Sequence, residues 1–208
     1  ETIDTPSLSD YSQRYCSIRN KQSGRYITFD LKGKAKVRQL ELKNKAGNDS
    51  AQLLRLDYLG FPIWKIYTAH HDSTDLCMEV KDARLEAGNE VIQNDYITTY
   101  QKEKINHQKW VIIPLGNGYC KIMNKDSGLF LTAVRRGQKE VLTVDDYRNS
   151  EAQQWKIEEH DERSDCKSIF AFGGAVSEAM KVYDVNTLFE WYDNKSGLMP
   201  RGTTLLKG

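Results

Sequence analysis

The side chains that most often perform catalysis are few and scattered in this chain. The histidines are His70, His71, His107 and His160. His71-Asp-Ser73 contains the residue types of a catalytic triad, but three consecutive residues cannot adopt the geometry that a triad needs. His70 and His71 are neighbours in a polar stretch, where we expect a solvated turn. The histidines therefore give no indication of an active site.

Motifs that bind metals, phosphates or nucleotides are also missing from the sequence. It contains no H-E-x-x-H pair, phosphate-binding loop, dinucleotide fingerprint or nucleophile elbow. Gly173-Gly174 is too short to hold a phosphate, and Cys77 beside Glu79 is better explained as a core or disulfide cysteine. We therefore expect no catalytic residues, no metal and no cofactor, and predict that the protein is not an enzyme.

The composition is that of a globular protein with balanced charge. Hydrophobic residues make up 39% and charged residues 28% of the 208 positions, and 30 basic residues stand against 29 acidic ones. This balance argues against a nucleic-acid partner, because nucleic-acid binders usually carry a basic excess. No stretch approaches the roughly 18 apolar residues that a membrane span requires. We therefore predict neither a nucleic-acid partner nor a membrane span.

Four widely spaced cysteines bear on the redox state. They are Cys16, Cys77, Cys120 and Cys166, and none forms the CxxC pair of a structural zinc site. An even number of cysteines in a chain that starts at Glu1 rather than Met predicts two disulfides in a secreted, extracellular protein. The pairing is open. The alternative is a set of reduced, buried thiols in a cytosolic protein.

An internal repeat indicates the architecture. Tyr15-Cys-Ser-Ile-Arg-Asn-Lys-Gln-Ser-Gly-Arg-Tyr-Ile-Thr28 and Tyr119-Cys-Lys-Ile-Met-Asn-Lys-Asp-Ser-Gly-Leu-Phe-Leu-Thr132 share Tyr, Cys, Ile, Asn, Lys, Ser, Gly and Thr at matching positions. The offset suits two units of about 52 residues, a period typical of repeated supersecondary units that bury a common core. A looser middle copy runs from Ile63-Trp-Lys-Ile66 to Leu76-Cys-Met-Glu-Val80.

Each unit also ends in a similar way. Gln108-Lys-Trp110 and Gln153-Gln-Trp155 are Q-x-W tripeptides that enter alternating strands, and Gln52-Leu-Leu54 takes the same place in the first unit. A Trp here can fill the core between units, while the Gln amide can satisfy backbone groups where the chain turns inward. Three units of about four short strands predict a closed, all-β body without exposed sheet edges.

The threefold plan, the two Q-x-W tripeptides and the Ser-Gly-x-x-Leu/Ile-Thr strands resemble the ricin-B-type lectin superfamily over residues 12–160. The resemblance implies a β-trefoil, which is a six-stranded barrel capped by three hairpins. The expected units are 12–60, 61–114 and 115–160, with an N-terminal arm at 1–11 and a C-terminal extension at 161–208.

The resemblance also implies where a sugar would bind. In such lectins a carboxylate accepts hydrogen bonds from sugar hydroxyls, an aromatic ring stacks on the sugar, and an Asn precedes the Q-x-W tripeptide. The middle unit comes closest to this pattern, with Glu79 at the carboxylate position and His107 in place of the Asn. The carbohydrate-binding residues predicted there are Glu79, Gln93, Asn94, Tyr96, Asn106, His107 and Gln108.

The other two units fit the lectin pattern less well. Thr28 and Thr132 stand at the carboxylate position, and a hydroxyl is a weaker partner than a carboxylate. Ala51 and Ala152 precede the two glutamines, and their side chains cannot hydrogen-bond to a sugar. Galactose recognition of the ricin type is therefore not expected in the first and third units.

The C-terminal extension has a different pattern from the repeats. Apolar residues between Val176 and Tyr192 recur at helical spacing, which predicts one amphipathic helix, or two short ones broken near Asn186. The helix could dock on the trefoil, tethered through Cys166. Alternatively, residues 166–192 could form the interface for a partner subunit.

Together these features predict a secreted binding module for glycans or glycoproteins at a cell surface, free-standing or as the delivery part of a toxin or adhesin. The alternative is a protein-binding trefoil, such as a protease inhibitor or an assembly subunit, that uses its loops and the C-terminal segment. A third interpretation, a trefoil enzyme or an actin-type cytoskeletal protein, would require reduced cysteines.

Overall fold

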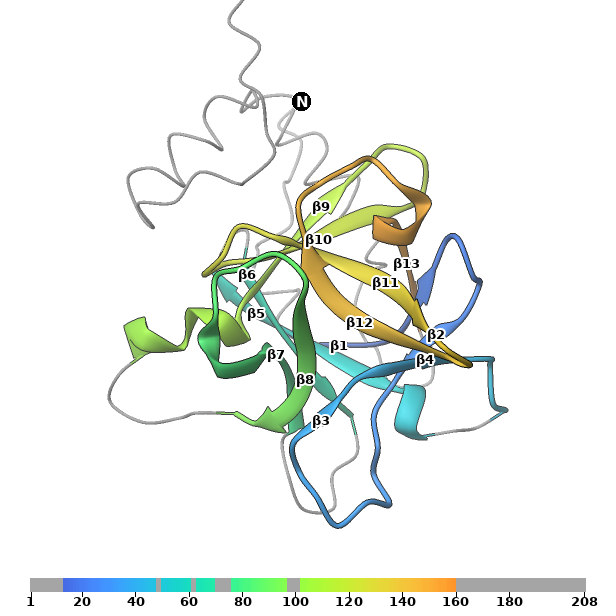
Figure 1. Cartoon of the computed structure of the whole chain (residues 1–208), viewed down its shortest axis with the longest axis horizontal. Coiled ribbons are helices and arrows are strands. Elements are labelled where there is room, and N and C mark those ends of the chain that lie inside the picture. Colours follow the sequence, from blue (N-terminus) through green and yellow to red (C-terminus); the bar gives the residue numbers. More distant parts are fainter. Residues whose placement is uncertain (1–12, 48–49, 61–62, 70–75, 97–101, 160–208) are drawn as a thin grey trace, which may run out of the picture.

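The computed structural model describes residues 13–47, 50–60, 63–69, 76–96 and 102–159. Within these ranges the chain forms thirteen β-strands and short 3₁₀ helices at Ser50–Gln52, Lys81–Ala83, Lys102–Gln108 and Glu151–Gln153 (Figure 1). The all-β prediction is confirmed. No helix within these ranges is long and apolar enough to cross a membrane.

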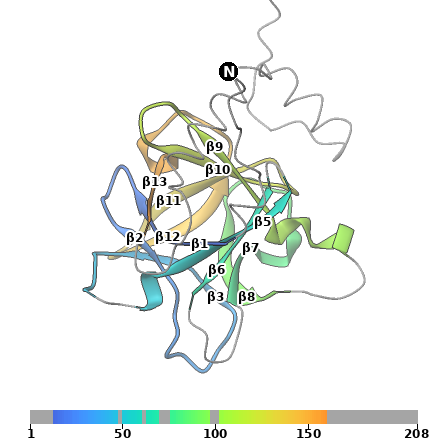
Figure 2. The same cartoon turned by 180° about the vertical axis from the view of Figure 1, so that it is seen from behind.

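Six of the described strands close into a barrel. Each strand pairs antiparallel with the next, and the last pairs with the first, so the ring has no open edge (Figure 1, and from behind in Figure 2). In ring order the strands are β1 (Gln13–Asn20), β5 (Leu54–Gly60), β6 (Ile63–Thr68), β9 (Trp110–Pro114), β10 (Cys120–Asn124) and β13 (Trp155–Glu159). Closure leaves no barrel strand with unpaired backbone for another chain to extend.

Three hairpins cap one end of the barrel, one from each unit. They are β2 (Tyr26–Thr28) with β4 (Glu41–Lys43), β7 (Leu76–Val80) with β8 (Asn89–Asp95), and β11 (Phe130–Arg136) with β12 (Lys139–Asp145). Strand β12 pairs with both β4 and β8, and the short β3 (Arg38–Gln39) pairs with β8. Neighbouring units are therefore hydrogen-bonded in the cap as well as in the barrel, which is the expected β-trefoil.

The two tryptophans of the Q-x-W tripeptides lie in the core between barrel and cap. Trp110 and Trp155 are both 0% exposed. The indole Nε1 of Trp110 donates to the Met78 carbonyl at 2.9 Å, and that of Trp155 donates to the Leu131 carbonyl at 3.0 Å. Each ring thus fills core volume and satisfies a carbonyl of its own unit's hairpin, as the repeat predicts.

A second repeated contact joins successive units. The side-chain amide of Asn124 donates to the His107 carbonyl at 3.0 Å, and that of Asn20 donates to the Ala152 carbonyl at 3.0 Å. Both carbonyls directly precede the Gln of a Q-x-W tripeptide. The Asn shared by the two matching repeat segments is therefore the residue that holds the neighbouring unit in place.

The cysteines depart from the sequence prediction. Cys16, Cys77 and Cys120 are buried and form no disulfide in the described part of the chain, while Cys166 lies outside it. The prediction of two disulfides is therefore wrong, since two bridges would need all four cysteines. Cys16 and Cys120 occupy equivalent positions on β1 and β10 and belong to the hydrophobic core. For these three cysteines, the structure agrees with buried thiols rather than with disulfides.

We expect Cys77 and Cys120 to resist alkylation in the native protein. Burial raises the pKa of the Cys120 thiol to about 12 and also raises that of Cys77, so neither is a reactive thiolate near neutral pH. Mass spectrometry after iodoacetamide treatment should find both unmodified under native conditions and modified in urea. Equal labelling in the two conditions would contradict their burial.

Several sequence predictions fall outside the described residues. These are the arm at 1–11, the helix between Val176 and Tyr192, the interface at 166–192 and the tether through Cys166. They stay predictions.

Candidate functional site

The glutamines of the three unit ends define equivalent positions in the three hairpins. The Nε2 of Gln52 donates to the Thr28 hydroxyl at 3.2 Å, and that of Gln153 donates to the Thr132 hydroxyl at 3.1 Å. The Nε2 of Gln108 donates to the Glu79 carboxylate in the same way. The alignment of the carboxylate position with Thr28, Glu79 and Thr132 is thus confirmed.

The same glutamines also fix a second set of positions. Their Nε2 atoms donate to the carbonyls of Asn44, Asp95 and Asp146, at 2.9, 3.0 and 2.8 Å. The residues just before these carbonyls are Lys43, Asn94 and Asp145. Asn94 stands near the position that the lectin pattern gives to its aromatic ring. None of these three equivalent residues is aromatic, so the stacking platform of the lectin pattern is absent from all three hairpins.

In the middle unit, Glu79 is only 4% exposed, and three of the other predicted residues surround it. One carboxylate oxygen accepts from Asn94 Nδ2 at 2.9 Å, and the other accepts from Gln108 and lies 3.6 Å from His107 Nε2. Burial alone would raise the pKa of Glu79, but the hydrogen bonds from His107, Asn94 and Gln108 outweigh it and lower that pKa. The carboxylate is therefore charged, and hydrogen bonds from neighbouring side chains of the same unit hold it in place.

The other three predicted residues point elsewhere. Gln93 is 1% exposed and binds the loop after β2, where its amide contacts the backbone of Asp30 and Lys36. Tyr96 receives the Lys65 ammonium 3.8 Å from its ring centroid. Gln93 lies apart from Glu79 because side chains along a strand alternate between its faces, and Gln93 lies opposite to Asn94. Tyr96 follows the end of β8 and packs on Lys65 instead.

Asn106 is the third residue that lies apart from Glu79. Its Oδ1 accepts from the Lys125 ammonium at 3.3 Å, and its carbonyl accepts from the Lys109 amide at 3.1 Å. It therefore supports the turn ahead of β9. Sequence position alone does not decide whether Asn106 or its neighbour His107 faces Glu79.

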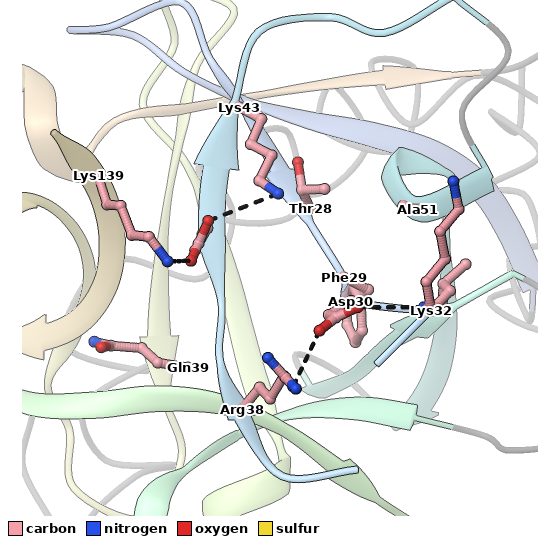
Figure 3. Close-up of a pocket in the computed structure, with 11 residues that line it drawn as sticks. Thr28, Phe29, Asp30, Lys32, Arg38, Gln39, Lys43, Ala51 and Lys139 are labelled. Atoms are coloured by element: carbon pink, nitrogen blue, oxygen red, sulfur yellow. Dashed lines mark hydrogen bonds and ion pairs between the residues drawn. The ribbon is translucent and has the colours of Figure 1, made fainter. Parts of the chain in front are cut away.

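The first unit holds an open cavity that the sequence prediction missed. Its volume is about 390 Å³ (Figure 3). It extends from Thr28 at the end of β2, past the loop that follows, to β3, β4 and Ala51, and Lys139 of the third unit closes one side. We call it the first-unit pocket, lined by Thr28, Phe29, Asp30, Leu31, Lys32, Arg38, Gln39, Glu41, Lys43, Ala51 and Lys139.

This pocket includes all three positions at which the lectin pattern contacts a sugar. Thr28 corresponds to Glu79, Lys43 corresponds to Asn94, and Ala51, just ahead of Gln52, corresponds to His107. The small Ala51 and Thr28 side chains leave room where the middle unit has Glu79 and His107. Thr28 and Ala51, which make the first unit a poor match to the lectin pattern, thus both line an open pocket.

Ion pairs shape the wall of the first-unit pocket. Arg38 Nε lies 3.0 Å from an oxygen of Asp30, whose other oxygen accepts from the backbone amides of Lys32 and Gly33 (Figure 3). A Cβ built on Gly33 would lie 2.5 Å from Asp30 Oδ2 and 3.0 Å from Arg38 Nε. Only glycine therefore fits beside the pair as it stands.

Part of the chain matches a known family. Residues 106–173 match the family model of the ricin-type β-trefoil lectin domain-like proteins. A search of curated proteins finds no match. No group of three or more His, Cys, Asp or Glu within the described residues is placed to hold a metal ion.

Solved structures share the fold at low sequence identity. The designed threefold-symmetric protein ThreeFoil is similar with a TM-score of 0.61 and 22% identity, over 70% of this chain and 99% of that one. A Polyporus squamosus lectin bound to the epitope Neu5Acα2-6Galβ1-4GlcNAc is similar with a TM-score of 0.58 and 17% identity, over 71% of this chain and 49% of that one. An exo-β-1,3-galactanase from Clostridium thermocellum has a TM-score of 0.58 and 20% identity, over 71% of this chain and 30% of that one.

The chain thus spans about half the length of that lectin and 30% of the galactanase. At these identities the likeness shows the fold alone. The closed six-stranded barrel and its three hairpins show that the described residues form a β-trefoil, and residues 106–173 match a ricin-type β-trefoil lectin-like domain.

Proposed function

We propose that the domain is a carbohydrate-binding module and that the first-unit pocket is its binding site. The observation that carries the proposal is an open cavity at the position where the fold family places its sugar contacts. Its volume of about 390 Å³ lies within the range of small-ligand sites, about 300–1,000 Å³. A site of this size suits one or two sugar residues.

The lining of the pocket suits a sugar chemically. Sugar hydroxyls both donate and accept hydrogen bonds, and the pocket offers both kinds of partner. The carboxylates of Asp30 and Glu41 accept, and the lysines and Arg38 donate. Phe29 and Leu31 add apolar surface. We propose that the domain binds its ligand and does not catalyse a reaction on it.

Glycans displayed at cell surfaces are the proposed targets, which would place the action of the protein outside the cell. The delivery of a toxic partner is a further proposal of the same kind. A disulfide framework was part of the reason to expect a secreted protein. The buried thiols of Cys77 and Cys120 therefore do not support the proposal that the protein acts outside the cell.

A glycan array tests the proposed function. The wild-type protein is expected to bind a subset of immobilised glycans, and Gly33→Ala should weaken this binding about tenfold, or ~1.4 kcal/mol. The added methyl group would displace the Asp30 and Arg38 side chains that form the pocket wall. Because these are the mobile ends of exposed side chains, the melting temperature should stay within about 2 °C of the wild-type value.

Gly47→Ala is the matched control for this experiment. Gly47 lies in the same unit, and a Cβ there would meet nothing within 4 Å. Its binding should therefore equal that of the wild type. A complete lack of glycan binding by the folded wild-type protein would overturn the proposal, and capture of a protein partner in its place would favour the protein-binding alternative.

A further inference from the structure

The first-unit pocket carries a larger net positive charge than the chain as a whole. Its lining includes four cations, Lys32, Arg38, Lys43 and Lys139. Only two carboxylates, those of Asp30 and Glu41, line it with them. The pocket is therefore at +2, whereas the entire chain of 208 residues has a formal charge of +1. A small region with this excess attracts anions.

The two carboxylates are already used within the wall. Asp30 pairs with Arg38 at 3.0 Å and also accepts from two backbone amides. Glu41 pairs with two lysines: one carboxylate oxygen lies 2.8 Å from Lys139 Nζ and the other lies 3.7 Å from Lys43 Nζ. Each carboxylate neutralises one charge, and the remaining two positive charges have no counter-charge in the lining.

At one of the three equivalent positions, the first unit alone has a cation. Lys43 stands where the middle unit has Asn94 and the third unit has Asp145, and Asp145 is itself paired with Arg148 at 2.9 Å. The position that would carry a stacking ring in the lectin pattern thus carries an ammonium group in this unit. An ammonium group recognises a charge, whereas a ring recognises the apolar face of a sugar.

We propose that the first-unit pocket selects acidic saccharides, whose carboxylate or sulfate group lies against Arg38, Lys43 and Lys139. This inference rests on the proposed function and specifies its ligand class. Arg38 can donate two parallel hydrogen bonds to either group, and the lysines add charge. The sugar hydroxyls would then face Thr28 and the oxygens of Asp30 and Glu41, which a bare inorganic anion would leave unused.

Lys139 lies far from Arg38 and Lys43 in the sequence, but all three line the same pocket. Lys139 comes from β12 and reaches Glu41 on β4 across the junction of the first and third units. The anion site is therefore assembled by the cap and requires the folded trefoil. Lys139, Lys43 and Arg38 are 70%, 60% and 48% exposed in their side chains, so a ligand can reach them.

Matched glycan pairs test the inference in the full chain. Chondroitin sulfate tetrasaccharide is compared with its desulfated form, and a sialylated trisaccharide with its asialo form, by titration calorimetry at constant ionic strength. At least one acidic member is expected to bind ten or more times more tightly than its neutral counterpart. The double variant Arg38→Gln/Lys43→Gln should lose at least tenfold in affinity for that acidic ligand.

Lys34→Gln/Lys45→Gln is the control double variant. It removes the same charge from exposed positions of the same unit that do not line the pocket, and its affinity should fall less than twofold. Equal losses in the two double variants would overturn the pocket as the anion site in favour of diffuse attraction. Equal affinity for acidic and neutral members would overturn the inference while leaving glycan binding intact, and binding of neither would refute both.

Discussion

Trp155→Ala is expected to destabilise the domain by about 3–5 kcal/mol, a large part of the stability of a domain of this size. Trp155 is 0% exposed, and its indole donates to the Leu131 carbonyl. It also pairs with Asn20 of β1 and Cys120 of β10, so the cavity would open where the first and third units meet. Urea unfolding followed by circular dichroism measures the loss.

Trp155→Phe separates the volume of the ring from its hydrogen bond. Phenylalanine keeps most of the apolar surface but leaves the Leu131 carbonyl without its donor, which should cost about 1–3 kcal/mol. Trp110→Ala serves as a symmetry control, since Trp110 has the same burial and the equivalent bond to Met78. A loss below about 1 kcal/mol in Trp155→Ala would show that this residue is not part of the core.

The second large effect is expected for Glu79→Ala, at about 3–5 kcal/mol. Removal of this buried carboxylate leaves the Asn94 and Gln108 amides without their acceptor. It also removes the negative charge that lies beside His107. Donors left unsatisfied in the interior are costly because water cannot replace the lost partner. Glu79→Gln keeps the shape and one acceptor oxygen, so its loss should be smaller, as thermal unfolding at neutral pH will show.

The effect of Glu79 should depend on pH in one direction. Its pKa is lowered in the folded protein, so its stabilising contribution is complete above the unfolded value of about 4.3. The contribution is lost as the pH falls below that value and through the folded pKa. The stability difference between wild type and Glu79→Gln should therefore shrink on acidification from pH 7 towards pH 3. A difference that grows instead would mean that burial dominates the titration of this group.

The same variant addresses the site that the sequence predicted. If the first-unit pocket carries the binding, folded Glu79→Gln protein should bind glycans as the wild type does. Loss of binding in this variant at unchanged fold would instead assign the function to the middle unit.

The fold could be predicted because its signals are core residues. Trp110 and Trp155 meet the same geometric need in the second and third units, and a Gln does so in all three, so these residues recur in the sequence at matching places. The barrel and its hairpins follow from that pattern together with the alternation of apolar residues. The carboxylate position of each unit was found by the same reasoning.

The candidate site was less accessible to sequence reasoning. The search for a carboxylate and a ring led to Glu79, whose carboxylate turned out to be bound by its own neighbours. The first-unit pocket depends on empty space beside Thr28 and Ala51, and on Lys139, which lies 98 positions from Glu41. No local pattern shows such a contact. The alternation of Lys32, Lys34, Lys36 and Arg38 was the one visible hint of a basic loop.

The disulfide prediction failed for a related reason. A count of cysteines says how many bridges are possible but not which way each side chain faces. Cys16 and Cys120 take equivalent places on inward-facing barrel positions, where a small apolar side chain packs well. The repeat had already paired these two residues in the alignment, which is an indication of a shared core role.

The pairing of β1 with β13 determines how the domain would respond to mechanical force. Cys16 lies opposite Glu159, so the start of the first strand and the end of the last are neighbours on the barrel. Tension applied through residues 13 and 159 would pull the two strands apart from one end and load their hydrogen bonds one after another. A trefoil held by both ends in this way should unzip at low force, because no set of bonds shares the load.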